Sequence, residues 1–207
     1  MHISEGVLNP PILSVGAVIT IAGTAIGIKK LDTDHIMTVS LLTATFFVAS
    51  LIHIPVGPGN VHLVLGGLIG VLLGWACFPA ILTALLLQAI FFHYGGLVVL
   101  GVNTTVMALP AVCCGFLFNK YIQEEGKKRK IAAFFAGLLS PLGSSMLMAL
   151  ALAATDSGFM KTAQLVFAAH IPMVIIEGFI TMFTVLFLAK VQPEIFLITK
   201  KTGEITK

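Results

Sequence analysis

The first residues of the chain, Met1-His2-Ile3, place an α-amine, a backbone amide and an imidazole in succession. We expect the initiator Met1 to be retained because the bulky side chain of His2 follows it. The amine and the His2 amide nitrogen can close a five-membered ring on one metal ion, and the amide and His2 Nδ1 can close a six-membered ring. Such nitrogen sets suit Ni(II), Cu(II) or Co(II), whereas Mg(II) and Ca(II) prefer oxygen ligands. A His at position 2 also occurs by chance, but the pattern predicts a square metal site with one corner open.

The N-terminal segment, residues 1–9, lacks the features of a secretory signal peptide. Such a signal begins with basic residues, whereas no Lys or Arg precedes Lys29 in this chain. We therefore expect residues 1–9 to remain in the mature protein as its metal-binding segment.

The overall composition is that of a membrane protein. Hydrophobic residues make up 57% of the 207 residues and charged residues only 10%, and the mean hydropathy is +1.04. A chain this apolar is expected to have the lipid bilayer as its solvent. The formal net charge of +3 is modest and lies in a few short segments, so it argues against nucleic-acid binding.

Apolar segments separated by polar or Pro/Gly-rich connections recur along the whole chain. Each is read as a membrane-spanning helix, because the hydrocarbon core of a bilayer requires about 20 apolar residues. The sequence predicts an all-α integral membrane protein with about seven transmembrane helices, forming a single domain over residues 1–207. The expected spans cover residues 12–28, 36–52, 63–76, 80–92, 104–118, 131–154 and 163–188.

Basic residues concentrate on one side of this arrangement. Lys29 and Lys30 follow the first span, a charged cluster fills residues 120–130 after the fifth span, and further lysines lie in the tail at 190–207. The opposite side receives the N-terminus and the histidine-containing connections 53–62 and 93–103. Because basic loops stay in the cytoplasm, we expect the N-terminus outside and the tail cytoplasmic.

Three histidines on the outer side could supply the fourth nitrogen: His53, His62 and His93. We favour His62, because its Pro/Gly-rich loop can fold inward and its imidazole precedes a Gly-rich helix that should pack inside the bundle. His53 and His93 are interpreted as ordinary structural residues, and the sequence assigns them no role.

Other polar residues in apolar surroundings also need a role. Glu5, Asn60 and Asn103 could orient the ligands or hydrogen-bond to the second nitrogen of an imidazole. His170 and Glu177 are seven residues apart and lie on one face of their helix. Since ionisable groups within a membrane are usually paired or functional, we expect these two to form a buried pair or to contact a partner.

Four groups of short motifs together resemble the CbiM/NikM family, the substrate-binding membrane components of energy-coupling-factor nickel/cobalt importers, over nearly the whole chain. The resemblance implies seven helices, with an N-terminal helix added to a six-helix substrate-binding fold, and a terminus that plugs the outer cavity. It also implies that the metal ligands are the Met1 amine, the amide and imidazole of His2, and His62. The matching residues are Met1-His2-Ile3 with Glu5-Gly6, Val61-His62-Leu63-Val64 with Gly66-Gly67, Gly101 with Asn103-Thr104 and Met107-Ala108, and His170-Ile171-Pro172 with Glu177-Gly178.

The chain has no GxxxxGK[ST] phosphate-binding loop, so it should not be an enzyme that hydrolyses ATP itself. The resemblance implies a multi-pass protein of a prokaryotic plasma membrane that imports Ni(II) or Co(II) with partner subunits. These are a transmembrane coupling subunit, cytoplasmic ABC ATPases and a small auxiliary membrane protein, which we expect to be a separate chain. The imported metal would feed cobalamin biosynthesis or a nickel enzyme.

Two other classes of protein are alternatives. A secondary, proton-coupled transition-metal permease would use His170 and Glu177 as a proton relay. An intramembrane enzyme is disfavoured, because Ser144 and Ser145 have no paired base in a recognisable motif. The sequence leaves open the choice between nickel and cobalt and the stoichiometry of the complex.

Overall fold

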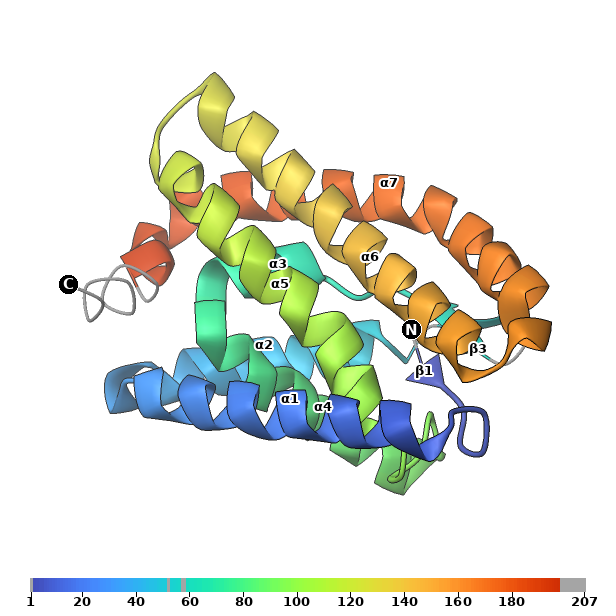
Figure 1. The fold of residues 1–207 in the computed structure, drawn as a ribbon. Coiled ribbons are helices and arrows are strands. Elements are labelled where there is room, and N and C mark those ends of the chain that lie inside the picture. The colour runs from blue at the N-terminus through green and yellow to red at the C-terminus, as the bar shows by residue number, and fades with distance from the viewer. Residues whose placement is uncertain (1, 52, 57–58, 198–207) are drawn as a thin grey trace.

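The computed structural model describes residues 2–51, 53–56 and 59–197, with only the backbone described for 53–56, 59–61, Ser157 and Leu197. Long helices lie side by side in an elongated bundle, with a small sheet that includes His2–Ile3 at one end and Pro193–Leu197 at the opposite end (Figure 1). The α-helices are α1 (Pro10–Lys30), α2 (Ile36–Ala49), α3 (Gly66–Leu73), α4 (Cys77–Phe92), α5 (Leu100–Gln123), α6 (Lys127–Thr155) and α7 (Met160–Val191).

Within the described residues, five helical segments are long and apolar enough to cross a membrane, by length and composition. The predicted helical membrane fold is therefore confirmed at this level. The segment 33–49, which contains α2, is apolar but shorter. The five segments are Pro10–Lys30, Gly66–Phe92, Leu100–Gln123, Lys127–Thr155 and Met160–Val191.

The expected third span is too short to cross a bilayer alone. Helix α3 has 8 residues, which corresponds to a length of about 12 Å. It continues through a 3₁₀ turn, Gly74–Ala76, into α4. Gly74 has φ 53° and ψ −124°, a conformation that glycine adopts readily, and the chain changes direction there (Figure 1). The segments 63–76 and 80–92 therefore form one apolar unit with a break at Gly74.

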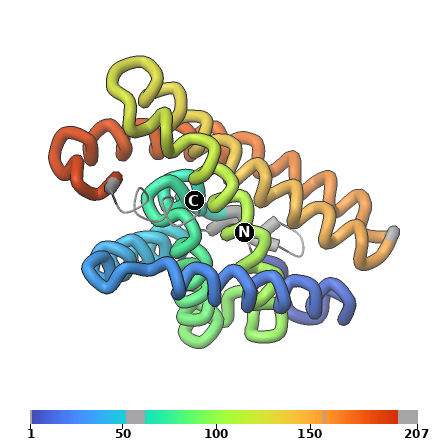
Figure 2. Tube along the Cα trace, turned by 60° about the vertical axis from the view of Figure 1, so that its left-hand side comes forward, coloured from blue at the N-terminus to red at the C-terminus, as the bar shows by residue number. Residues whose placement is uncertain are grey.

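Helix α3 is completely buried, as the sequence predicted for a glycine-rich helix. A Cβ at Gly67 would collide with the backbone of Ala136 in α6, and a Cβ at Gly70 would collide with the carbonyl of Ala111 in α5. Small residues thus let three helices meet at backbone contact. Figure 2 shows α3 enclosed between the other helices.

Residues expected to form a plain loop between the second and third spans instead form strands. Strands β2 (His53–Val56) and β3 (Gly59–His62) pair antiparallel, and β1 (His2–Ile3) pairs with the other side of β3. This sheet, in the order β1-β3-β2, adds three short strands to the predicted helical architecture. The terminal segment is therefore held in an extended conformation beside β3.

Helix α1 fixes the position of the terminal strand by packing closely on α5. Thr20 Oγ1 donates a hydrogen bond to the Gly101 carbonyl at 2.6 Å, and Thr105 Oγ1 donates one to the Gly16 carbonyl at 2.9 Å. At the start of α1, the side chain of Asn9 accepts a hydrogen bond from the Ile12 amide, as an N-cap residue does. Residues 2–9 are therefore anchored at the end that joins α1.

Candidate metal site

The sheet brings the imidazoles of His2 and His62 together. His2 pairs with Asn60 in the register of β1 and β3, so His62, two residues further along β3, lies on the same face of the sheet. The ring centroids of the two histidines are 4.7 Å apart with an interplanar angle of 37°. His2 is 2% exposed and His62 is 0% exposed, so the pair is enclosed by the bundle.

Gln88 on α4 determines which nitrogen of His2 carries the proton. The Nε2 of Gln88 donates to the carbonyl of Phe47 at 3.1 Å and also bonds to the hydroxyl of Ser50, which orients the amide. The Oε1 of Gln88 therefore faces His2 Nε2 at 2.9 Å, and because this oxygen only accepts, Nε2 must donate. In the neutral tautomer of His2 that this bond selects, the unprotonated nitrogen is Nδ1, the one needed by a terminal chelate.

A backbone carbonyl fixes the tautomer of His62 in the same way. His62 Nδ1 lies 3.0 Å from the carbonyl oxygen of Leu63, so Nδ1 donates and Nε2 is unprotonated. Burial, with a smaller effect of nearby His170, lowers the pKa of His62 to about 4, although the bond to Leu63 acts in the opposite direction. The imidazole is therefore neutral at neutral pH, the form in which histidine binds metals.

Asn103 on α5 holds the backbone of the terminal strand. Its Oδ1 accepts from the Ile3 amide at 2.9 Å, and its Nδ2 donates to the Ile3 carbonyl at 3.1 Å. This side-chain amide thus pairs with β1 on the edge opposite β3. Asn103, predicted to orient the ligands, contacts the strand that carries His2 rather than an imidazole.

Glu5 connects the terminal segment to the link between α4 and α5. Glu5 Oε1 accepts from the Val98 amide at 2.9 Å, and the Glu5 amide donates to the Gly95 carbonyl at 3.1 Å. Gly95 and Gly96 have φ values of 74° and 129°, where other residues are strained. A Cβ at Gly95 would lie 2.8 Å from Asn103 Nδ2 and 3.4 Å from His2 Cδ2. The backbone of this link therefore packs directly against the imidazole of His2.

His170 and Glu177 of α7 are both buried but are held by different neighbours. His170 Nδ1 donates to the Val166 carbonyl at 2.6 Å, while Glu177 Oε1 accepts from the Val64 amide. In the described part of the chain no hydrogen bond joins the two side chains. Glu177 thus contacts the segment just after His62, two residues beyond the imidazole.

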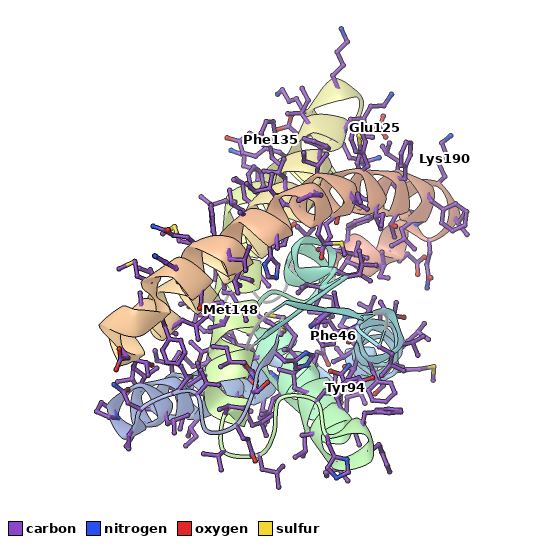
Figure 3. The ribbon with its side chains drawn as sticks, turned by 90° about the vertical axis from the view of Figure 1, so that its right-hand side faces the viewer. Phe46, Tyr94, Glu125, Phe135, Met148 and Lys190 are labelled. Carbon is purple, nitrogen blue, oxygen red and sulfur yellow. The ribbon has the colours of Figure 1, made fainter. Side chains whose placement is uncertain are left out.

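Several predicted site residues lie apart from this cluster or outside the described atoms. Met1 is outside the described residues, and so are the side chains of His53 and Asn60. His93 is exposed at the end of α4, and Tyr94, labelled in Figure 3, has its ring centroid 6.3 Å from that of His2. Gln88 is the contact that the sequence interpretation missed. A single buried glutamine in an otherwise apolar helix was the available signal.

These features define a polytopic helical membrane protein whose N-terminal strand is built into the bundle and brings the imidazole of His2 beside that of His62. The chain belongs to the CbiM family, whose sequence profile, described as the cobalt uptake substrate-specific transmembrane region, matches residues 2–195. The chain is accordingly a multi-pass membrane component of cobalt/nickel uptake and not an enzyme.

Individual relatives agree with this family. A putative metal transport protein of Haemophilus influenzae is 44% identical over 199 residues, which cover 94% of this chain and 96% of that protein. The fused nickel transport protein NikMN of Rhodobacter capsulatus is 36% identical, over 69% of this chain and 43% of its own length. The crystal structure of a transition metal transporter, 23% identical, covers 100% of both chains with a TM-score of 0.81, which supports the fold.

Proposed function

We propose that this chain is the substrate-binding membrane subunit of an energy-coupling-factor ABC importer for Ni(II) or Co(II). The ion would be held by four nitrogens: the Met1 amine, the His2 amide, His2 Nδ1 and His62 Nε2. The observation that carries this proposal is the buried His2–His62 pair, in which the hydrogen bonds to Gln88 and Leu63 engage the other nitrogen of each ring.

The separation of the two imidazoles supports a square arrangement. In the terminal chelate the amide is the central nitrogen, so His62 would lie opposite the amide and adjacent to His2 Nδ1. With metal–nitrogen bonds of about 2.0 Å, adjacent imidazoles on one ion have ring centroids about 4.5 Å apart. The observed centroid distance of 4.7 Å is close to this value. Imidazoles on opposite corners would be about 6 Å apart by the same geometry.

We further propose that the N-terminus lies outside and the tail is cytoplasmic. Successive helices alternate in direction, and the sheet lies at the end opposite Pro193–Leu197, the last described residues (Figure 1). Glu125, in the charged 120–130 segment, lies near Lys190 in Figure 3. These positions support one basic, cytoplasmic end. A captured ion would then arrive at the end that carries His2 and His62.

Transport through this subunit would require partners. We propose a transmembrane coupling subunit, cytoplasmic ABC ATPases and a separate auxiliary membrane subunit. The fused NikMN relative, of which this chain matches 43%, supports an association with a further subunit. The lack of a phosphate-binding loop in the sequence supports placing ATP hydrolysis on a partner.

Uptake of radioactive nickel or cobalt into cells tests this function. We expect accumulation when the chain is expressed with its coupling subunit and ATPases, and loss of accumulation when the ATPase is inactivated by mutation. Expression of the chain alone is the matched control. Accumulation by the chain alone that a protonophore abolishes would instead favour the proton-coupled permease.

A further inference from the structure

We propose a second, weaker metal-binding subsite on the outer face, formed by Glu5 and His93, through which the ion reaches the buried histidines. This inference rests on the proposed function and adds a route to its metal site. The ligand is a partly hydrated divalent first-row transition-metal ion.

The subsite lies in a surface groove of about 540 Å³. The groove is formed by the terminal segment after β1, the last turn of α4 and the link that follows α4. Its lining contains one carboxylate and one imidazole, and both side chains are exposed. The lining residues that matter here are Ser4, Glu5, Ala89, His93, Gly95 and Gly96.

Only a thin layer separates this groove from the buried pair. Gly95 lines the groove, and a Cβ at Gly95 would be 3.4 Å from His2 Cδ2, so the backbone of Gly95 lies between groove and imidazole. Ala89, on the same lining, follows Gln88, which bonds to His2. Because His2 and His62 are 2% and 0% exposed, an ion must displace a covering segment to reach them.

Glu5 joins the terminal segment to the link that covers His2. The Glu5 amide donates to the Gly95 carbonyl, and Glu5 Oε1 accepts from the Val98 amide. A Cβ at Gly96 would collide with the Glu5 side chain, so this carboxylate lies directly against the link. An ion that binds the carboxylate would compete with the Val98 amide for its oxygens. Metal arrival would thereby loosen the segment that covers His2.

The ligand chemistry fits a transient site. An imidazole and a carboxylate both bind first-row transition metals, and a carboxylate can accept at more than one position. Two protein ligands leave the ion with most of its water, whereas the proposed inner site offers four nitrogens. His93 has φ 56° at the end of α4, where glycine is the usual residue. The alternative is that His93 only terminates α4 and binds no metal.

Metal-binding kinetics distinguish these two roles. Stopped-flow mixing of Ni(II) with the C-terminally tagged protein, followed through a metallochromic competitor dye, gives the association and dissociation rate constants. We expect His93→Ala to lower the association and dissociation rate constants equally, by about tenfold, so that the Kd is unchanged. Tenfold is about the smallest rate enhancement that a charged cleft provides. Glu5→Gln, which keeps an acceptor for the Val98 amide, should reduce the association rate and its dependence on salt.

His35→Ala is the matched control, because His35 lies in the turn between α1 and α2 and should leave both rate constants unchanged. Wild-type rate constants in both His93→Ala and Glu5→Gln would overturn the subsite while leaving the inner site intact. A weaker Kd with an unchanged association rate would also overturn it, since that result assigns His93 to structure. Failure of the wild-type protein to bind Ni(II) at all would instead contradict the proposed function.

Discussion

Adding one residue before Met1 should abolish tight binding of Ni(II) and Co(II) by the purified protein. The extension converts the α-amine into a peptide nitrogen and destroys the terminal chelate ring. It would also need space beside β1, where His2 is 2% exposed and Asn103 holds the Ile3 backbone. Loss of a residue that only hydrogen-bonds to a metal ligand lowers affinity by up to about 100-fold. Because the extension removes a ligand itself, we expect a loss of at least about 100-fold.

The metal content of detergent-purified protein provides the measurement. The same tag placed at the C-terminus is the control, because it leaves the amine intact. Equal metal loading of the N-terminally extended and the C-terminally tagged proteins would show that the terminus is not a ligand.

His62→Ala should weaken metal binding by a similar factor, about 100-fold or more, because it removes the fourth nitrogen rather than an outer partner. His62 is fully buried, and its ring centroid lies 4.7 Å from that of His2. Competition with a chelator of known affinity measures the change in Kd, and circular dichroism checks that the helices remain.

His53→Ala is the sharpest comparison for this prediction. The register of β2 and β3 places His53 directly opposite His62, but on the strand farther from β1. We expect His53→Ala to bind metal almost as tightly as the wild-type protein. A greater loss at His53 than at His62 would mean that the other imidazole is the ligand.

Much of the helical fold could be predicted from the apolar segments. The predicted first span at 12–28 lies within α1 (Pro10–Lys30), and the predicted fifth span at 104–118 lies within α5 (Leu100–Gln123). The signal was direct because lipid-facing helices are apolar over long stretches. The break at Gly74 was harder to predict, since a glycine inside an apolar run is also common at helix contacts.

The pairing of the terminal strand could not be read from the sequence. Pro55, Gly57, Pro58 and Gly59 are typical of a loop, and a two-residue strand such as β1 has no detectable alternation. The partners of β1, at Gly59 and Asn60, are almost sixty residues away in the chain. His2 and His62 could therefore be proposed as ligands from their chemistry, but their contact depends on long-range backbone pairing. Gln88 offered a signal, as a lone amide in an apolar helix, but its bond to His2 could not be predicted without the position of β1.

The spin state of bound nickel tests the four-nitrogen site most directly. A strong square of nitrogens makes Ni(II) low-spin, so the C-terminally tagged protein loaded with one Ni(II) should be diamagnetic. Magnetic susceptibility together with the visible spectrum of the loaded protein measures this state. A paramagnetic ion, as expected for six-coordinate nickel bound by oxygens and imidazoles, would contradict the site built from Met1, His2 and His62.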